Sequence, residues 1–336
     1  MTILITGATG RIGSRLAKAL LERKKHVRTL VLPDDPNLGR ARQVGIECLP
    51  GSITDFGDAL RVAEGVDTVF HLAAIMPFDQ KESDSHSIIW DVNIQGTYHV
   101  LEAAIQRGRR PLRLIFASSD MVYPAGAPRY HPVNETHPRF PNSFYGLGKV
   151  IGEEMIRFYG RCEEGIDISI ARFTCTQSTE ELIDPNGFFA RQMFFVNGRL
   201  NALKESSSTN SKVLQTIKIL EPLAAPDEPL LLPYDCDGNP FWVETTDVRD
   251  IVQGLLLILD RPEAIDQVFN LTPPTIVSMA ELIPYMAKAT GRRYVEAKLP
   301  FGISKVHTSG AKARTLLGYN PKYTIFDMID KAVGKL

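Results

Sequence analysis

The sequence is poor in the features that mark several classes of protein. Only four cysteines occur in 336 residues, and no two of them form a CxxC pair; they are Cys48, Cys162, Cys175 and Cys236. We therefore expect a reducing compartment and no structural disulfides. The seven histidines include no HExxH motif, so neither zinc hydrolysis nor any other metal site is predicted.

The sequence also has no excess of positive or negative charge and no long apolar run. The 38 basic and 39 acidic side chains leave a net charge of -1, and no basic run exceeds Arg109-Arg110. This balance argues against a nucleic-acid partner. The longest wholly apolar run, residues 255–259, is far shorter than the roughly 20 residues of a membrane span. The first residues do not resemble a signal peptide, so we expect a cytoplasmic protein without a membrane partner.

The first half of the chain alternates short apolar runs with helical patterns. Strands are expected at residues 2–6, 27–32, 48–50, 66–72, 112–118 and 166–173. The clearest helical patterns lie at residues 11–24, 87–106 and 143–160. This alternation is typical of parallel βαβ units and predicts an α/β fold, a Rossmann-like doubly wound parallel sheet.

The alternation breaks after residue 173. We predict a cofactor-binding domain at residues 1–174, to which later segments (about 241–272) return. Residues 175–336 are expected to form mostly a smaller substrate-binding cap, with an irregular insert at about 200–240. The serine-rich stretch 205–211 within that insert is interpreted as a mobile loop, with a substrate lid as the alternative.

A glycine-rich turn follows the first predicted strand and opens the first helix. Its sequence is Gly7-Ala-Thr-Gly10-Arg-Ile-Gly13. One glycine allows the tight turn, one lets the backbone approach a pyrophosphate, and one lets the helix pack against the strand. The amides of the helix N-terminus then favour phosphate. Dinucleotide binding is therefore predicted.

The end of the second predicted strand separates NAD from NADP. An acid there holds the ribose hydroxyls of NAD, whereas an arginine meets the 2′-phosphate of NADP. This chain has Leu32-Pro33, and Asp34 is close enough to take the acidic role. Arg28 or Arg11 is able to reach a phosphate instead. We expect NAD, with NADP as the alternative.

Tyr145 and Lys149 are four residues apart on a predicted helix and share one face of it. An ammonium beside a phenol favours the phenolate and lowers its pKa, which would make Tyr145 an acid and base toward a substrate hydroxyl. Ser119 ends a predicted strand 26 residues earlier and offers a hydroxyl to the same substrate oxygen. A turn cap is the alternative role for Ser119.

These motifs occur in a characteristic order along the chain. They are TGATGRIG (6–13), GSITD (51–55), HLAA (71–74), DVNIQGT (91–97), FASSDMVY (116–123), YGLGK (145–149) and ARF (171–173). Weaker matches follow at residues 246–248 and 313–318. The chain resembles an extended short-chain dehydrogenase/reductase, the NAD-dependent epimerase/dehydratase family, over nearly all of its length except about 175–240.

The resemblance implies roles for individual residues. It places the pyrophosphate at the turn that contains Gly7, Thr9, Gly10, Arg11, Ile12 and Gly13, and adenine beside Ser52 and Ile53. The remaining cofactor contacts would be Leu72, Ala73, Ala74, Asn93 and Phe173. Tyr145 would be the general acid and base, Ser119 its hydrogen-bonding partner, and Lys149 would also hold the nicotinamide ribose.

The chain departs from the family pattern on the substrate side. Nucleotide-sugar epimerases of the family carry an arginine for the diphosphate where this chain has Pro240, and an asparagine where it has Cys175. Arg191 or Arg199 is able to supply a phosphate contact instead. Asp120 is followed by Met121 rather than by the glutamate of sugar dehydratases, which argues against 4,6-dehydration. Asp120, Met121, Cys175 and Arg191 are the candidate substrate contacts.

The predicted function is Tyr-assisted hydride transfer at a secondary alcohol of a sugar or sugar derivative. One alternative is a simple dehydrogenase or carbonyl reductase of a non-nucleotide substrate. A second is a cofactor-binding sensor without turnover, against which the intact Ser119, Tyr145 and Lys149 argue. The resemblance also implies a homodimer through helices at about 87–106 and 143–160.

Overall fold

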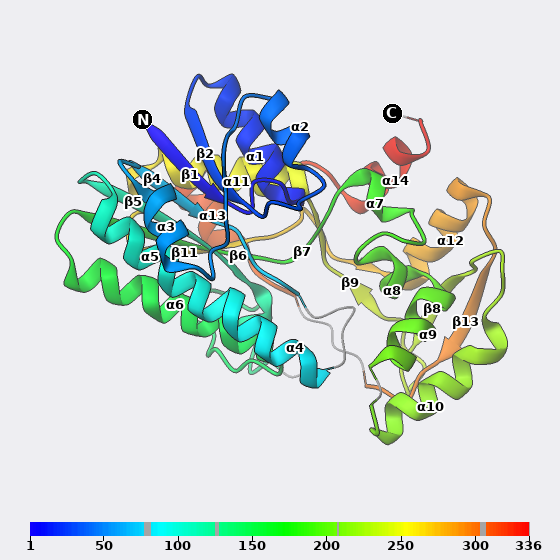
Figure 1. The fold of residues 1–336 in the computed structure, drawn as a ribbon. Helices are drawn as coiled ribbons and strands as arrows, with labels where there is room; N and C mark the ends of the chain where they lie inside the picture. The colour runs from blue at the N-terminus through cyan, green and yellow to red at the C-terminus, as the bar shows by residue number, and fades with distance from the viewer. Residues whose placement is uncertain (77–81, 125–127, 207, 303–306, 336) are drawn as a thin grey trace.

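A computed structural model describes residues 1–76, 82–124, 128–206, 208–302 and 307–335, arranged as a large sheet domain and a smaller lobe (Figure 1). The sheet has seven strands in the order β11-β6-β5-β4-β1-β2-β3, and all of its strand pairs are parallel. The bounds are β1 Thr2–Thr6, β2 His26–Val31, β3 Glu47–Pro50, β4 Thr68–His71, β5 Leu112–Ser119, β6 Ile166–Phe173 and β11 Gln267–Leu271. The predicted Rossmann-like class is confirmed.

Helices cover both faces of this sheet because the strands are apolar on both sides. In β1, Ile3 and Ile5 join the core that contains Leu16, while Leu4 joins the opposite core with Val100. The first face carries α1 Arg11–Glu22, α11 Val248–Asp260 and α13 Ala311–Leu317. The second carries α3 Phe56–Ala63, α5 Gly96–Arg107 and α6 Phe144–Cys162. Two faces buried in this way are the expected state of a parallel sheet.

Further short elements complete the domain. A π-helical segment, Trp90–Gln95, joins α4 (Glu82–Ile89) to α5, so one continuous helical run spans the predicted 87–106. The others are α2 Leu38–Gln43, η2 Asp120–Val122 and η4 Pro262–Ala264. The strand order reverses between β1 and β4, and ligands of doubly wound sheets bind at the carboxyl ends of the strands beside such a point.

The smaller lobe is built from the segment between β6 and α11 and from the segments after β11 other than α13. Its helices are α7 Thr179–Leu182, α8 Ala190–Phe194, α9 Val196–Glu205, α10 Ser211–Leu220, η3 Glu221–Leu223, α12 Met279–Thr290 and α14 Ile325–Ala332. Its strands form pairs: β7 Cys175–Gln177 with β10 Thr245–Asp247, β8 Leu230–Tyr234 with β13 Tyr294–Lys298, and β9 Trp242–Val243 with β12 Val277–Ser278. Leu230 and Leu232 face one apolar core, and Leu231 faces another.

The insert at about 200–240, expected to be irregular, contains regular elements, as does the segment before it. The segment folds into α7 to α10, η3 and β8, because apolar side chains such as Val196 and Leu200 recur once per helical turn and reach a core. The serine-rich stretch connects α9 to α10, with Asn210 accepting a hydrogen bond from the Lys212 amide as the N-cap. Residue 207 of that stretch lies outside the described residues.

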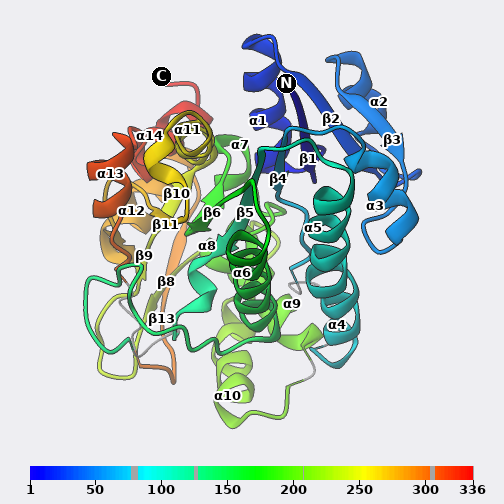
Figure 2. The ribbon, with the colours of Figure 1, turned by 90° about the vertical axis from the view of Figure 1, so that its left-hand side faces the viewer.

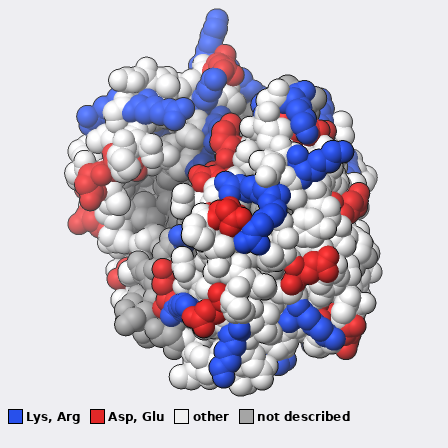
Figure 3. Space-filling model, turned by 90° about the vertical axis from the view of Figure 1, so that its right-hand side faces the viewer, with Lys and Arg blue, Asp and Glu red and all other residues white. Residues whose placement is uncertain are grey.

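The later segments return to the sheet domain. β11 pairs with β6 along its whole length, and α11 packs against α1. No helix in the described ranges is long and apolar enough to cross a membrane. On the face in Figure 3, basic and acidic side chains alternate rather than gather by sign.

Candidate active site

The glycine turn between β1 and α1 has the geometry that close packing demands. Gly7 has a φ of +74°, a region that other residues rarely adopt, and a Cβ there would lie 3.1 Å from the Ala73 backbone. A Cβ at Gly13 would lie 2.1 Å from the Gly7 carbonyl oxygen. At Gly7 and Gly13, the backbone before and within the first turn of α1 therefore carries no side chain. This arrangement fits the pyrophosphate of a dinucleotide.

A cavity of about 950 Å³ extends from this turn to the carboxyl ends of β5 and β6. The predicted residues that line it are Gly7, Thr9, Gly10, Arg11, Ile12, Gly13, Leu72, Ala74, Ser119, Asp120, Met121, Tyr145, Lys149, Phe173 and Cys175. Its lining does not include Asp34, Ser52, Ile53, Ala73, Asn93 or Arg191. The structure thus brings the glycine turn and the Tyr-Lys pair into one space.

The acid that meets the glycine turn is Asp35 rather than the expected Asp34. Thr9 Oγ1 donates to Asp35 Oδ2 at 2.7 Å, and the Asn37 amide donates to Asp35 Oδ1 at 2.7 Å. Asn37 lines the cavity, whereas Asp34 is exposed. Arg28 is turned away, because its Nε donates to Glu47 and its Nη1 to the Glu64 carbonyl. The adjacent acids were visible in the sequence, but the turn geometry that selects one was not.

Three residues expected to touch the cofactor are not among those that line the cavity, and each has hydrogen-bond partners within the chain. Ile53 packs into the core on the α5 side, and its carbonyl contacts His99 Nδ1 at 3.0 Å. The Ser52 amide donates to Asp58 at 2.9 Å. The Ala73 amide donates to Thr6 Oγ1 at 3.2 Å, which ties the end of β4 to that of β1.

Asn93 does not line the cavity but holds Ile75, which does. Its Oδ1 accepts from the Ile75 amide and its Nδ2 donates to the Ile75 carbonyl, both at 2.8 Å. Ile75 lines the cavity, and Asn93 is only 3% exposed. Asn93 therefore fixes the segment after β4 from behind.

The predicted catalytic side chains converge from β5 and α6. α6 begins at Phe144, and the Ser143 side chain caps it by accepting from the Gly146 amide at 3.0 Å. Lys149 Nζ donates to the Ala117 carbonyl at 2.8 Å and lies 5.6 Å from the Tyr145 ring centroid. Ser119 Oγ donates to Asp120 Oδ1 at 3.0 Å.

The prediction of a lowered pKa for Tyr145 is wrong for the protein alone. Burial raises the pKa of Tyr145 above its ordinary value of 10.0, the charge of Asp120 adds to the rise, and a hydrogen bond with Ser119 opposes it. Burial also lowers the pKa of Lys149 to about 8, against the opposing charge of Glu153. Desolvation outweighs the ammonium because both groups are almost fully enclosed.

Two buried carboxyls, Asp120 and Glu244, interact electrostatically near Tyr145, and Asp120 alone of the two is among the residues that line the cavity. Burial raises the pKa of Asp120 to about 6. Burial, and then the charge of Asp120, raise the pKa of Glu244 to about 8. Both oxygens of Glu244 accept from Thr308, whose Oγ1 donates at 2.9 Å. Glu244 was missed in the sequence, since it lies more than a hundred residues from Asp120.

The remaining candidate substrate residues differ in position. Met121 and Cys175 line the cavity, and the Cys175 Sγ lies 3.7 Å from Met193 Sδ. Burial raises the pKa of the Cys175 thiol to about 12, so the thiol stays protonated. Arg191 belongs to α8 and lines neither this cavity nor the second cavity described below.

Arg11 lines the cavity, but its side chain does not stay at the glycine turn. The guanidinium forms an ion pair with Glu181 of α7. All four cysteines are free thiols. Within the described parts of the chain, no group of three or more histidine, cysteine, aspartate or glutamate side chains is placed to hold a metal ion.

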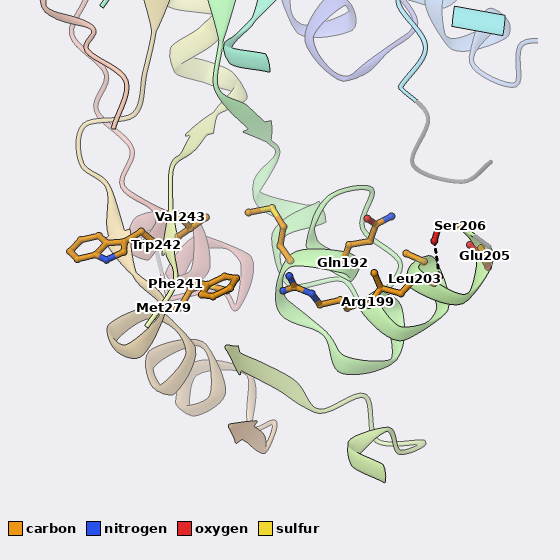
Figure 4. A pocket seen from close by; sticks show the side chains of 11 residues that line it. Gln192, Arg199, Leu203, Glu205, Ser206, Phe241, Trp242, Val243 and Met279 are labelled. Atoms are coloured by element: carbon orange, nitrogen blue, oxygen red, sulfur yellow. Dashed lines mark hydrogen bonds between the residues drawn. The ribbon is translucent and has the colours of Figure 1, made fainter. Parts of the chain in front are cut away.

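A second cavity of about 490 Å³ adjoins the first, and Met193 lines both. Figure 4 shows Gln192 and Arg199 entering it from α8 and α9, opposite Phe241 and Trp242. The Arg199 guanidinium lies 5.9 Å from the Phe241 ring centroid. Burial lowers the pKa of Arg199 to about 10, so this cation would be stabilised by an anionic ligand.

The chain is similar to several known proteins. A short-chain dehydrogenase/reductase superfamily protein from Agrobacterium tumefaciens, solved with bound NAD, has 33% identity and a TM-score of 0.89; the match covers 100% of this chain and 97% of that one. A putative UDP-glucose 4-epimerase of Methanocaldococcus jannaschii is 33% identical over 55% of this chain and 58% of its own length. A uronate dehydrogenase of Pseudomonas syringae pv. tomato is 33% identical over 47% of this chain.

The chain spans little more than half the length of these two curated relatives, 58% and 53%. A family model covers much more of the chain. The model of the NAD dependent epimerase/dehydratase family matches residues 3–272, from β1 to the residue after β11. The resemblance inferred from the motifs is confirmed, and the chain belongs to the NAD dependent epimerase/dehydratase family.

Proposed function

We propose that this protein is an epimerase-type oxidoreductase that transfers hydride at a secondary alcohol of a sugar or sugar derivative. The observation that carries the proposal is the meeting of Ser119, Tyr145 and Lys149 with the glycine turn in one cavity. Bound NAD would supply the hydride acceptor there. The glycine turn, with Thr9 and Ile12, would hold its pyrophosphate, and Lys149 its nicotinamide ribose.

The chain's own residues would handle the substrate proton. The Tyr145 phenol exchanges a proton with the substrate hydroxyl, and Ser119 donates or accepts a hydrogen bond at the same oxygen. Lys149 lies under the Tyr145 ring, and a positive charge there favours the phenolate. Burial raises the pKa of Tyr145 in the protein alone, and the positive charge of a bound nicotinamide would oppose that rise.

The second cavity supports a substrate with an anionic end. Arg199 lines this cavity together with Phe241, Trp242 and Met193, and a phosphate or carboxylate bound there would neutralise its charge. A simple dehydrogenase acting on a non-nucleotide substrate is the second candidate. It is favoured by Pro240 and Cys175, and by Arg199 being the one basic residue among those that line this cavity in the described chain.

A ligand panel tests these proposals. Melting temperatures are measured with NAD, then with UDP, GDP, dTDP or CDP added, and then with free sugars and sugar acids. A ligand at 100 times its dissociation constant adds about 2.7 kcal/mol of stability, which a melting scan detects. A further shift with one nucleoside diphosphate supports the nucleotide-sugar substrate. Net absorbance change at 340 nm with a free sugar acid would favour the dehydrogenase.

We further propose NAD over NADP, because the Asp35 carboxylate accepts hydrogen bonds from Thr9 and Asn37, two residues that line the cavity. A 2′-phosphate would meet this carboxylate and be repelled. We expect NAD to bind at least about tenfold more tightly than NADP, a difference of about 1.4 kcal/mol. Titration calorimetry of wild type and D35N measures it; D34N is the matched control. Equal affinity of the wild type for both cofactors would contradict the proposal.

We also propose a homodimer through α6 and the run from α4 to α5, which lie side by side in Figure 2. This face exposes large apolar side chains: Trp90, Tyr98 and Phe158 are 51%, 46% and 52% exposed. Exposed apolar patches of this kind mark interaction surfaces. Light scattering should give twice the chain mass of 37.4 kDa, and the W90E/F158E double variant should give the single mass. A monomeric mass for the wild-type protein would contradict the proposed dimer.

A further inference from the structure

Arg11 connects the cofactor half of the cavity to the smaller lobe. It is the first residue of α1, directly after Gly10, and its guanidinium reaches Glu181 in α7. Nη2 donates to Glu181 Oε1 at 2.8 Å, and Nε donates to Oε2. The two side chains are only 19% and 31% exposed. This bidentate, partly enclosed geometry makes a stronger contact than an ordinary surface pair.

Aromatic rings enclose the same guanidinium. The Arg11 Cζ lies 5.2 Å from the Phe188 ring centroid and 5.3 Å from that of Phe189. The two rings meet edge to face at 4.9 Å. Cation–π contact and reduced solvent access both strengthen the pair.

The Glu181 carboxylate is held in place independently of Arg11. It is the N3 residue of a capping box, in which the Ser178 amide donates to Glu181 Oε2 at 3.1 Å. One turn further along α1, Arg15 contacts Glu180 at 3.4 Å in a more exposed pair. The seam between α1 and α7 therefore has one enclosed pair and one exposed pair.

The enclosed pair borders the cavity that would hold the cofactor. Arg11, Glu181, Phe188 and Phe189 all line it, together with Gly10. We propose that the Arg11–Glu181 pair is a clasp that closes this wall over the glycine turn and slows release of the bound dinucleotide. The inference rests on the proposed function. Slow release suits a reaction that returns its hydride to the substrate and needs no cofactor exchange.

A direct phosphate contact by Arg11 is the competing role, and the two predict opposite results for one variant. Replacing Glu181 with glutamine opens the clasp. It would also free Arg11 and remove a neighbouring negative charge. If Arg11 bound phosphate directly, release from E181Q would therefore slow down. With a clasp, release becomes faster.

Stopped-flow fluorescence of NADH, displaced by excess NAD, measures the release rate. We expect release on the order of tenfold faster for both E181Q and R11Q, with no further increase in the double variant. Glutamine preserves the capping box at Glu181, and melting curves check folding. E180Q is the matched control and should stay within about twofold of wild type.

Three outcomes would overturn the clasp. Slower or unchanged release from E181Q refutes it while leaving the cofactor site intact. Additive effects in the double variant show that the two residues act separately. A wild-type protein that binds neither NADH nor NAD removes the proposed function and the clasp together, so the two failures are distinguishable.

Discussion

Turnover of the Y145F variant is expected to fall by about a hundredfold to ten-thousandfold, the usual contribution of a positioned acid and base. Phenylalanine keeps the ring beside Lys149 and Ser119 but has no proton to exchange. Affinity for NAD should stay nearly unchanged, because the glycine turn is untouched. Steady-state kinetics with the substrate that the panel identifies measures the loss, and calorimetry measures NAD binding.

Tyr159→Phe is the control for this prediction. Tyr159 lies on the same helix, and its hydroxyl donates to Glu102 at 2.7 Å, away from the cavity. Y159F should lose a little stability and keep its activity. A Y145F enzyme with full turnover would refute the assignment of Tyr145 and reopen the alternative of a binding protein.

The E153Q variant is expected to lose about 3–5 kcal/mol of stability, the usual cost of breaking a buried ion pair from one side. Glu153 is fully buried, and both of its oxygens accept from Arg172 at 2.7 Å. Arg172 is itself only 2% exposed. Glutamine would leave the Arg172 charge without its counter-ion. Urea denaturation measures the free energy of unfolding.

The next residue on the helix provides the control. Glu154 is 51% exposed and contacts Arg139 and Arg157, so E154Q should cost no more than about 1 kcal/mol. Equal losses of unfolding free energy for the two variants would show that burial of Glu153 does not determine its contribution to stability.

The loss in E153Q should depend on pH. Burial alone would raise the pKa of Glu153, but hydrogen bonds and charge from Arg172 outweigh it and hold the pKa below 4.5. The carboxylate therefore stabilises the fold above pH 4.5, and this contribution disappears as the pH falls through the lowered pKa. The difference between wild type and E153Q should shrink over that acidic range.

Local patterns sufficed for the sheet domain and the centre of the site. The glycine spacing and the Tyr145–Lys149 spacing are set within a single turn or helix, so the sequence contains all the geometry that they need. The same holds for the strands, because a run buried on both faces is apolar throughout.

Prediction failed where several short helices follow one another. α8 has five residues and α9 has ten, so each offers too few turns for a clear period. Their cores include Phe194 and Leu232, which are brought together by packing and not by spacing. Asp35 was missed for a related reason, since only the turn after β2 decides which of two adjacent acids accepts the hydrogen bond from Thr9.

Partners distant in sequence were not predictable at all. Arg11 and Glu181 are separated by 170 positions, and Glu153 and Arg172 by 19. Nothing in their local sequence distinguishes these charges from solvated ones. The same applies to the pKa of Tyr145, because the burial that raises it depends on every element around the cavity.

The pairing of β11 with β6 has a consequence for synthesis on the ribosome. β6 ends at Phe173, and its outer edge is covered only after β11 (Gln267–Leu271) has left the exit tunnel. At about 5–20 residues per second, the wait lasts about 5 to 20 seconds. During it the nascent sheet has an open edge, which is the kind of template that invites aggregation. A chain cut after residue 174 would keep that edge permanently.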